Sequence, residues 1–153
     1  MRTIGNETII EDIFIDAPPE RVYRALTDPS ELLQWWGDPG VYWCTSWTLD
    51  LRVGGKWRSE GRSRQGGAFS VEGEFTEIVP PRTIAFSWKP SWVESTTQVR
   101  IVLMTEAGGT RLEWTQSGFG GNRKALDDHK GGLPSVIAWL KRHAESKPEE
   151  KVR

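Results

Sequence analysis

This 153-residue chain has little cysteine and histidine, and its net charge is close to zero. The single cysteine, Cys44, excludes an internal disulfide, and this usage is typical of a reducing cytoplasm. The two histidines, His129 and His143, would lie about 21 Å apart along one helix, so they cannot share a metal ion. A formal net charge of −1 provides no overall field to attract nucleic acid or an anionic membrane. We therefore expect a cytoplasmic protein with no metal, no cofactor and no nucleic-acid partner.

Long apolar runs are also missing. No segment approaches the roughly 20 apolar residues that a membrane-spanning helix needs, and the N-terminal MRTIGNETIIED lacks the apolar core of a signal peptide. With 37% hydrophobic and 27% charged residues, the composition is that of an ordinary globular protein. We expect one domain over residues 1–146, followed by a disordered polar tail over residues 147–153.

Tryptophan, in contrast, is abundant, with nine residues against five phenylalanines and two tyrosines. Most of them fall in segments that alternate like strands and are joined by short turns, which predicts an antiparallel meander. The seven expected strands span residues 7–16, 42–52, 56–64, 68–79, 83–89, 96–105 and 110–117. Alternation predicts that the inward-facing tryptophans are Trp43, Trp47, Trp57, Trp88 and Trp114. It also predicts that Cys44 faces outward, and a slip of one residue would reverse each assignment.

The remaining segments have helical patterns. Pro18-Pro19-Glu20 is typical of a helix start, and we expect helices from there to about Thr27 and from Ser30 to Trp35-Trp36. A helical stripe near the C-terminus comprises Leu126, His129, Leu133, Ile137, Leu140 and Ala144. Gly131-Gly132 and Pro134 interrupt this stripe, so we expect a kink or a break there. The fold expected from these elements is α+β: a curved antiparallel sheet of six to seven strands wrapped around a long C-terminal helix, with two short helices at one end.

Five segments resemble, in order, those of a known family. They are ERVYRALTDPSELLQWWG, LDLRVGGKWR, VEGEFTEIVPPRTIAFSW, GGTRLEWTQSGF and HKGGLPSVIAWLKRH. Over about Ile9 to Ala144 the chain resembles proteins similar to the C-terminal domain of the activator of the heat-shock-protein-90 ATPase, in the START-like or helix-grip superfamily. The resemblance implies a helix-grip fold with an internal hydrophobic cavity. It also implies a large aromatic residue where this chain has Leu133, so we expect a wider cavity at that position. Since no counterpart of the co-chaperone's N-terminal domain is found, we expect no chaperone activation.

Two features have both a structural and a functional interpretation. His129 is either a core residue with satisfied hydrogen bonds or a polar anchor for a ligand. Trp35-Trp36, beside a glycine-rich loop, is either a plug that seals the core or a gate that moves when a ligand enters. The glycine-rich segment 118–124 lacks the Gly-Lys-Ser/Thr ending of a phosphate loop, so we interpret it as a connection between a strand and a helix.

These patterns favour a protein that binds a hydrophobic, aromatic or lipid-like small molecule for transport, sensing or sequestration. The expected ligand-binding residues are Trp36, Trp43, Trp47, Trp57, Trp88, Trp114, Phe119, His129, Leu133 and Ile137. No catalytic residue is assigned. Two alternatives stay open: an enzyme of the same fold that uses His129 or Glu113 for proton transfer, and a chaperone-partner module. The sequence is also compatible with a homodimer.

Overall fold

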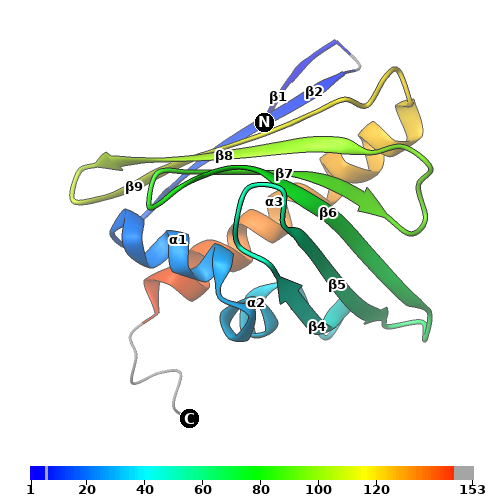
Figure 1. Cartoon of the computed structure of the whole chain (residues 1–153), viewed down its shortest axis with the longest axis horizontal. Coiled ribbons are helices and arrows are strands. Elements are labelled where there is room, and N and C mark those ends of the chain that lie inside the picture. The colour runs from blue at the N-terminus through cyan, green and yellow to red at the C-terminus, as the bar shows by residue number, and fades with distance from the viewer. Residues whose placement is uncertain (6, 147–153) are drawn as a thin grey trace.

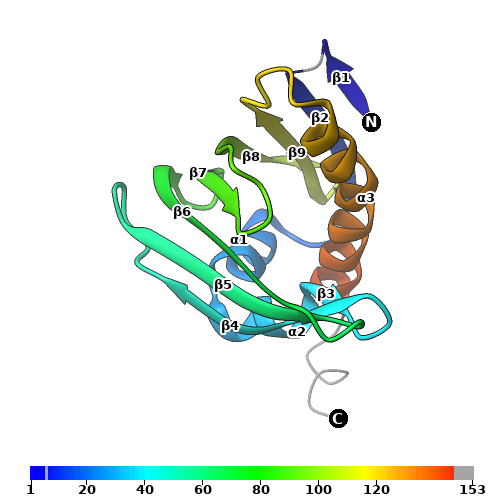
Figure 2. The same ribbon diagram turned by 90° about the vertical axis from the view of Figure 1, so that its right-hand side faces the viewer.

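A single antiparallel sheet curves around one long helix in the computed structural model, which describes residues 1–5 and 7–146 (Figures 1 and 2). Two short helices lie against the same concave side, near one end of the sheet. The expected α+β helix-grip fold is therefore confirmed. The disordered tail expected over residues 147–153 lies outside the described residues. Among the helices of the described part, none has both the length and the apolar character that crossing a membrane requires.

The sheet has nine strands within the described residues, more than the six to seven expected. Along the chain the elements are β1 (Arg2–Ile4), β2 (Thr8–Ile15), α1 (Pro19–Thr27), α2 (Pro29–Trp35), β3 (Gly37–Asp38), β4 (Tyr42–Leu49), β5 (Lys56–Ser63), β6 (Ala68–Val79), β7 (Thr83–Pro90), β8 (Thr97–Glu106), β9 (Gly109–Ser117) and α3 (Arg123–Glu145). Their order in the sheet is β1-β2-β9-β8-β7-β6-β5-β4-β3. The additional strands, β1 and β3, lie at the two edges and are too short for alternation to reveal them.

Strand β4 contains a bulge that corrects one part of the predicted register. Cys44 pairs with Gly61 and Ser46 pairs with Glu60, so Thr45 is an extra residue on β4. An extra residue reverses the alternation that precedes it. Trp47 packs on the core as predicted, but Trp43 is 40% exposed, and the prediction that it faces inward is wrong. Cys44, predicted to face outward, is half-buried against the core.

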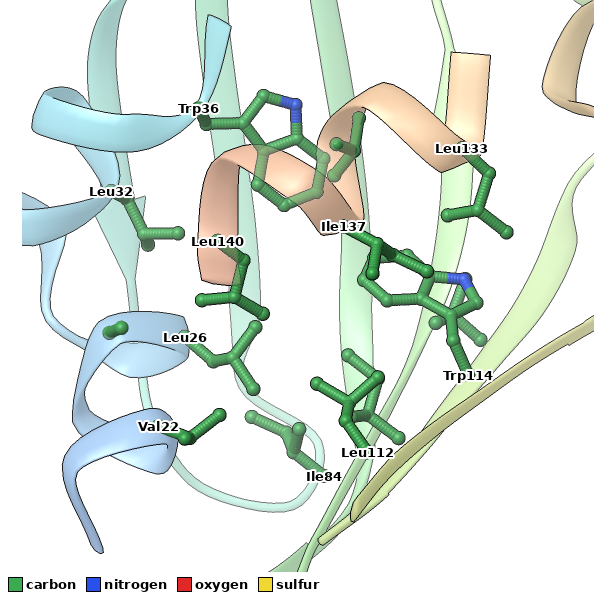
Figure 3. Close-up of a cluster of buried hydrophobic side chains, with 14 of the residues drawn as sticks. Val22, Leu26, Leu32, Trp36, Ile84, Leu112, Trp114, Leu133, Ile137 and Leu140 are labelled. Carbon is green, nitrogen blue, oxygen red and sulfur yellow. The ribbon is translucent and has the colours of Figure 1, made fainter. Parts of the chain in front are cut away.

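Helix α3 crosses the concave face of the sheet and runs without a break through Gly131, Gly132 and Pro134. Of the two outcomes expected there, the break is wrong. Proline cannot donate the backbone hydrogen bond of an interior helical residue, which costs stability locally. Apolar side chains of α3 before and after Pro134 offset this loss, because they are buried against the short helices and the sheet (Figure 3). Those of α3 that Figure 3 labels are Leu133, Ile137 and Leu140.

A charged cluster joins the three helices at the end of the core. The Glu31 carboxylate of α2 accepts hydrogen bonds from Arg21 Nη1 at 2.5 Å and from His143 Nε2 of α3 at 2.8 Å. Arg24 Nε lies 3.0 Å from its second oxygen. Burial raises the pKa of Glu31, but the hydrogen bonds from Arg21 and His143 outweigh burial, so the pKa lies below its ordinary value of 4.5. Glu31 is thus ionised in the folded protein at neutral pH. Its hydrogen bonds to Arg21 and His143 hold α2 against α1 and α3.

Glu31→Gln should lower the free energy of unfolding by about 1–3 kcal/mol at neutral pH, since buried donors would lose a charged acceptor. A lowered carboxyl pKa contributes stability that is present above the unfolded value and lost as pH falls through the folded value. The difference between wild type and variant should therefore shrink as the pH falls below 4.5. Urea unfolding measured from neutral to acid pH tests both points. Glu77→Gln, which removes an exposed partner of Arg100, is the matched control and should change stability little. If the difference in unfolding free energy between wild type and Glu31→Gln instead grows as the pH falls, Glu31 does not have a lowered pKa.

Candidate ligand-binding pocket

A pocket of about 560 Å³ lies between the concave face of the sheet and α3. Its aromatic and aliphatic lining comprises Trp36, Val41, Tyr42, Trp47, Phe69, Val71, Trp88, Trp92, Trp114, Leu133 and Val136. Its polar lining comprises Cys44, Ser59, Ser63, Arg64, Gln65, Gln116, Asp128 and His129, and the glycines Gly40 and Gly132 complete the wall. The volume falls within the range of small-molecule sites, and the wall combines many apolar groups with few polar ones, as such sites do.

The Trp36 indole is the centre of the aromatic cluster. Its ring centroid lies 5.2 Å from that of Trp47 on β4, 5.8 Å from that of Trp88 on β7 and 6.3 Å from that of Trp114 on β9. Its Nε1 donates to the Tyr42 hydroxyl at 3.2 Å. The neighbouring Trp35 indole donates to the Ala25 carbonyl at 2.8 Å and is buried in the core. Trp35 thus has the role of a plug, whereas Trp36 forms part of the pocket wall; that it also acts as a gate stays a prediction.

Both ring nitrogens of His129 have protein partners. Nε2 accepts a hydrogen bond from Trp88 Nε1 at 3.0 Å, and Nδ1 lies 2.7 Å from the Ala125 carbonyl. A carbonyl only accepts, so Nδ1 carries the proton and the ring is the neutral tautomer. Phe119 packs edge-on against the same ring at 5.3 Å. Of the two interpretations, the satisfied core residue describes this geometry, although one edge of the ring also contributes to the pocket wall.

A polar corner of the pocket is formed by β4 and β5. Trp47 and Ser59 are directly paired positions on these strands, and Cys44 lies beside them. Burial raises the pKa of the Cys44 thiol above 9.0, with an opposing effect from weak hydrogen bonds to Ser59 and Trp47. Burial likewise raises the pKa of Tyr42 to about 12. All four groups are therefore uncharged at neutral pH.

The sequence-predicted site residues are only partly brought together. Those that line the pocket are Trp36, Trp47, Trp88, Trp114, His129 and Leu133. Three others, Trp57, Phe119 and Ile137, are buried in the core beside it, and Trp43 lies on the outer face of the sheet. Trp57 reaches across the sheet: Gly73 has no Cβ, and a Cβ there would lie 2.5 Å from Trp57 Nε1, which donates to the Ser87 carbonyl at 3.2 Å.

Sequence reasoning missed several lining residues. Tyr42, Cys44 and Ser59 were not selected, because the bulge at Thr45 reversed the parity of the first two and serine gives no apolar signal. Trp92 follows β7 in a loop, where alternation makes no assignment. Pairing β4 with β5 while allowing one extra residue on β4 would have placed Tyr42 and Cys44 on the inner face.

The polar groups of the pocket limit its chemistry. Neither nitrogen of His129 is available for proton transfer in this arrangement. Glu113 alternates with the inward-facing Leu112 and Trp114 on β9, so it lies on the opposite face of the sheet from the pocket. Among the described residues, no three histidine, cysteine or acidic side chains are grouped as metal ligands. The arrangement is suited to enclosing an apolar molecule.

The pocket reaches the surface beside exposed groups. Val41 and Trp92 are 58% and 56% exposed at its rim, and Arg64 and Asp128 are the charged residues of the lining. The loop after α2 contributes Trp36 and Gly40 to the wall, and the glycine-containing part of α3 contributes Gly132 and Leu133.

Comparison with known proteins gives a consistent result. The model of the family described as "Activator of Hsp90 ATPase homolog 1-like protein" matches residues 16–145. A search of the curated proteins found no match. A crystal structure of a protein from Chromobacterium violaceum is similar over 92% of this chain and 99% of its own, with a TM-score of 0.80 and 27% identity.

Solution structures show the same fold at lower identity. A protein from Arthrobacter aurescens is 19% identical with a TM-score of 0.81, over 97% of this chain and 91% of its own. An AHSA1-like protein from Aeromonas hydrophila is 22% identical with a TM-score of 0.77, over 90% and 92%.

Cys44 offers a direct test of the pocket's polar corner. Because its pKa is raised, the thiolate fraction at about pH 8 should be low, and iodoacetamide should alkylate the folded protein about tenfold more slowly than the urea-unfolded chain. The chain has one cysteine, so the incorporated mass reports this site alone. Equal rates in the two states would show that the thiol is neither buried nor perturbed.

Proposed function

The chain belongs to the family of Activator of Hsp90 ATPase homolog 1-like proteins, whose START-like fold often binds hydrophobic ligands, and on this basis we propose that its pocket binds an apolar, ring-containing small molecule. The observation that carries the proposal is the pocket of about 560 Å³ with tryptophan rings in its walls. Flat aromatic side chains favour flat ligands, since offset stacking adds about 0.5–1.5 kcal/mol per ring pair beyond area burial. Aliphatic lipid-like chains would lose this contribution.

The proposed role is binding, for transport, sensing or sequestration, rather than turnover. Catalysis of proton transfer needs a side chain with a free acidic or basic atom facing the substrate. His129 has both nitrogens engaged with Trp88 and Ala125, and Glu113 lies on the far face of the sheet. The proposal concerns a small molecule only and assigns no chaperone partner.

Native mass spectrometry of protein purified from its own cells tests the proposal most directly. We expect an additional mass that persists in the native spectrum and is released when the protein is denatured. Chromatography of the released fraction should recover an apolar compound with rings. A protein that carries no such mass and that binds no member of a panel of neutral aromatic compounds would contradict the proposal.

Leu133→Trp should reduce ligand binding by about tenfold or more while the protein stays folded. Leu133 lies in the pocket wall, and a larger ring at this position would occupy part of the volume that a ligand needs. Displacement of a neutral fluorescent dye such as N-phenyl-1-naphthylamine measures the affinity, and circular dichroism with thermal melting measures the fold.

The matched control is Ser135→Trp, which adds the same side chain at an exposed position of α3 outside the pocket. This variant should bind the dye and its competitors as the wild type does. If Leu133→Trp binds equally well, or if both variants lose binding to the same extent, the ligand does not occupy the space beside Leu133.

A further inference from the structure

Gln116 is a polar side chain of the pocket wall whose hydrogen bonds are only partly made. It lies on the inner face of β9, two residues after Trp114, and is 2% exposed. Its amide nitrogen Nε2 donates to Thr97 Oγ1 on β8 at 2.9 Å. Its carbonyl oxygen Oε1 accepts no hydrogen bond from the residues that the structure describes. A buried acceptor without a donor loses its interaction with water and gains nothing in return.

The Oε1 atom of Gln116 is open to the pocket. Within residues 1–5 and 7–146, the fully buried side-chain atoms that lack a partner are Tyr23 Oη, Trp47 Nε1, Ser59 Oγ, Ser95 Oγ and Trp114 Nε1. Gln116 Oε1 also lacks a partner and is not one of these atoms, so the small accessible part of Gln116 includes it. Because Gln116 lines the pocket, a ligand there can touch this oxygen.

The hydrogen bonds of Thr97 determine which end of the Gln116 amide faces the pocket. Thr97 Oγ1 lies 3.5 Å from the Trp88 carbonyl, which can only accept, so the hydroxyl proton points there. The hydroxyl oxygen then accepts from Gln116 Nε2. Thr97 is 3% exposed, so water does not compete for its hydroxyl. This arrangement orients the amide with its acceptor oxygen toward the pocket.

The neighbouring donors of the wall are not open to a ligand. Trp88 Nε1 donates to His129 Nε2, and His129 Nδ1 donates to the Ala125 carbonyl. Trp114 Nε1 is fully buried. A ligand on this side of the pocket therefore meets an acceptor at Gln116, and a ligand that carries a donor satisfies it.

The surroundings of Gln116 favour a neutral donor over a cation. Its neighbours Thr97 and Trp114 are buried and uncharged. The charged residues of the pocket lining, Arg64 and Asp128, are exposed and of opposite sign. An ammonium group at Oε1 would lose its hydration with no buried carboxylate to compensate, whereas a hydroxyl group exchanges water for the amide oxygen at a much smaller cost.

We propose that the pocket selects ring compounds that carry a neutral hydroxyl group, of the phenol type, and that Gln116 Oε1 accepts a hydrogen bond from this hydroxyl. The ring lies against the tryptophans of the wall, and the hydroxyl points to β9. This inference rests on the proposed function, because it concerns the same pocket, and it adds the chemical class of the ligand.

The test compares 2-naphthol with 2-methylnaphthalene, in which a methyl group of similar size replaces the hydroxyl and cannot donate. Gln116→Met removes the acceptor and keeps the length of the side chain. The affinity ratio of 2-naphthol to 2-methylnaphthalene should fall about tenfold from wild type to this variant. The first compound loses its acceptor, and the second no longer leaves one unpaired. Dye displacement measures both affinities.

Gln98→Met is the matched control, because it makes the same substitution at an exposed position of β8 outside the pocket. It should leave the affinity ratio unchanged, and thermal melting verifies that both variants are folded. In ¹⁵N-labelled wild type, 2-naphthol should shift the side-chain amide resonances of Gln116 more than 2-methylnaphthalene does. Equal shifts would overturn the inference, and this measurement decides it if Gln116→Met does not fold.

Two further compounds test the polarity of the group that the site accepts. 2-Acetylnaphthalene carries an acceptor without a donor, and 2-(aminomethyl)naphthalene is a cation at neutral pH. Both should bind more weakly than 2-naphthol. Tighter binding of the ketone would mean that Nε2 of Gln116 faces the pocket, and tighter binding of the cation would mean that the site selects charge. Either result overturns the inference.

The outcomes distinguish this inference from the proposed function. If the affinity ratio is the same in wild type and Gln116→Met, the hydroxyl preference is overturned, while the apolar pocket function stands. If neither 2-naphthol nor 2-methylnaphthalene binds, the inference is again overturned, and native mass spectrometry decides separately whether an apolar ligand is carried.

Discussion

The contact of the Trp36 indole with three strands is the interaction on which the pocket depends. Its ring touches Trp47, Trp88 and Trp114, which come from both flanks and the middle of the curved sheet. Trp36 follows directly after α2, so its position depends on how that helix is held. The Glu31 cluster and the Trp35 hydrogen bond to Ala25 hold α2 against α1 and α3. The charged cluster at one end of the core thereby positions an apolar ring in the pocket.

A wide, strongly curved sheet with one long helix explains why a pocket is present at all. A single helix covers a stripe of about 10 Å, whereas nine strands about 4.8 Å apart form a much wider concave surface. Near α1 and α2, apolar side chains such as Leu26, Leu32 and Ile84 fill most of the space and leave a void of only about 30 Å³ (Figure 3). Towards Leu133 the covering is thinner, because Gly131 and Gly132 contribute no side chains to α3. Tryptophans fill part of that region and leave the rest as the pocket.

The sequence was sufficient for the fold, because strand alternation and the helical stripe depend on burial on one face, which this sheet and helix both have. Trp57, Trp88 and Trp114 face inward as alternation requires. Trp43 does not, because a bulge changes parity without any residue type that marks it. For the pocket, apolar residue type identified Trp36 and Leu133 but not Ser59, whose importance depends on a cross-strand partner. Local pattern therefore predicts which face is buried better than it predicts which residues of that face line the pocket.

Hydrogen-bond satisfaction provides information about a ligand that apolar lining alone does not. An apolar wall selects by shape and area, and the free energy of apolar burial does not discriminate among many molecules of similar size. A polar group that faces a cavity discriminates strongly, since a ligand without a matching donor or acceptor leaves it unpaired. His129 is the contrasting case: it lies in the same wall, but Trp88 and Ala125 already occupy both nitrogens. Of the two interpretations that the sequence leaves open for His129, the internally satisfied residue matches this geometry, so its ring gives the wall shape rather than a free polar group.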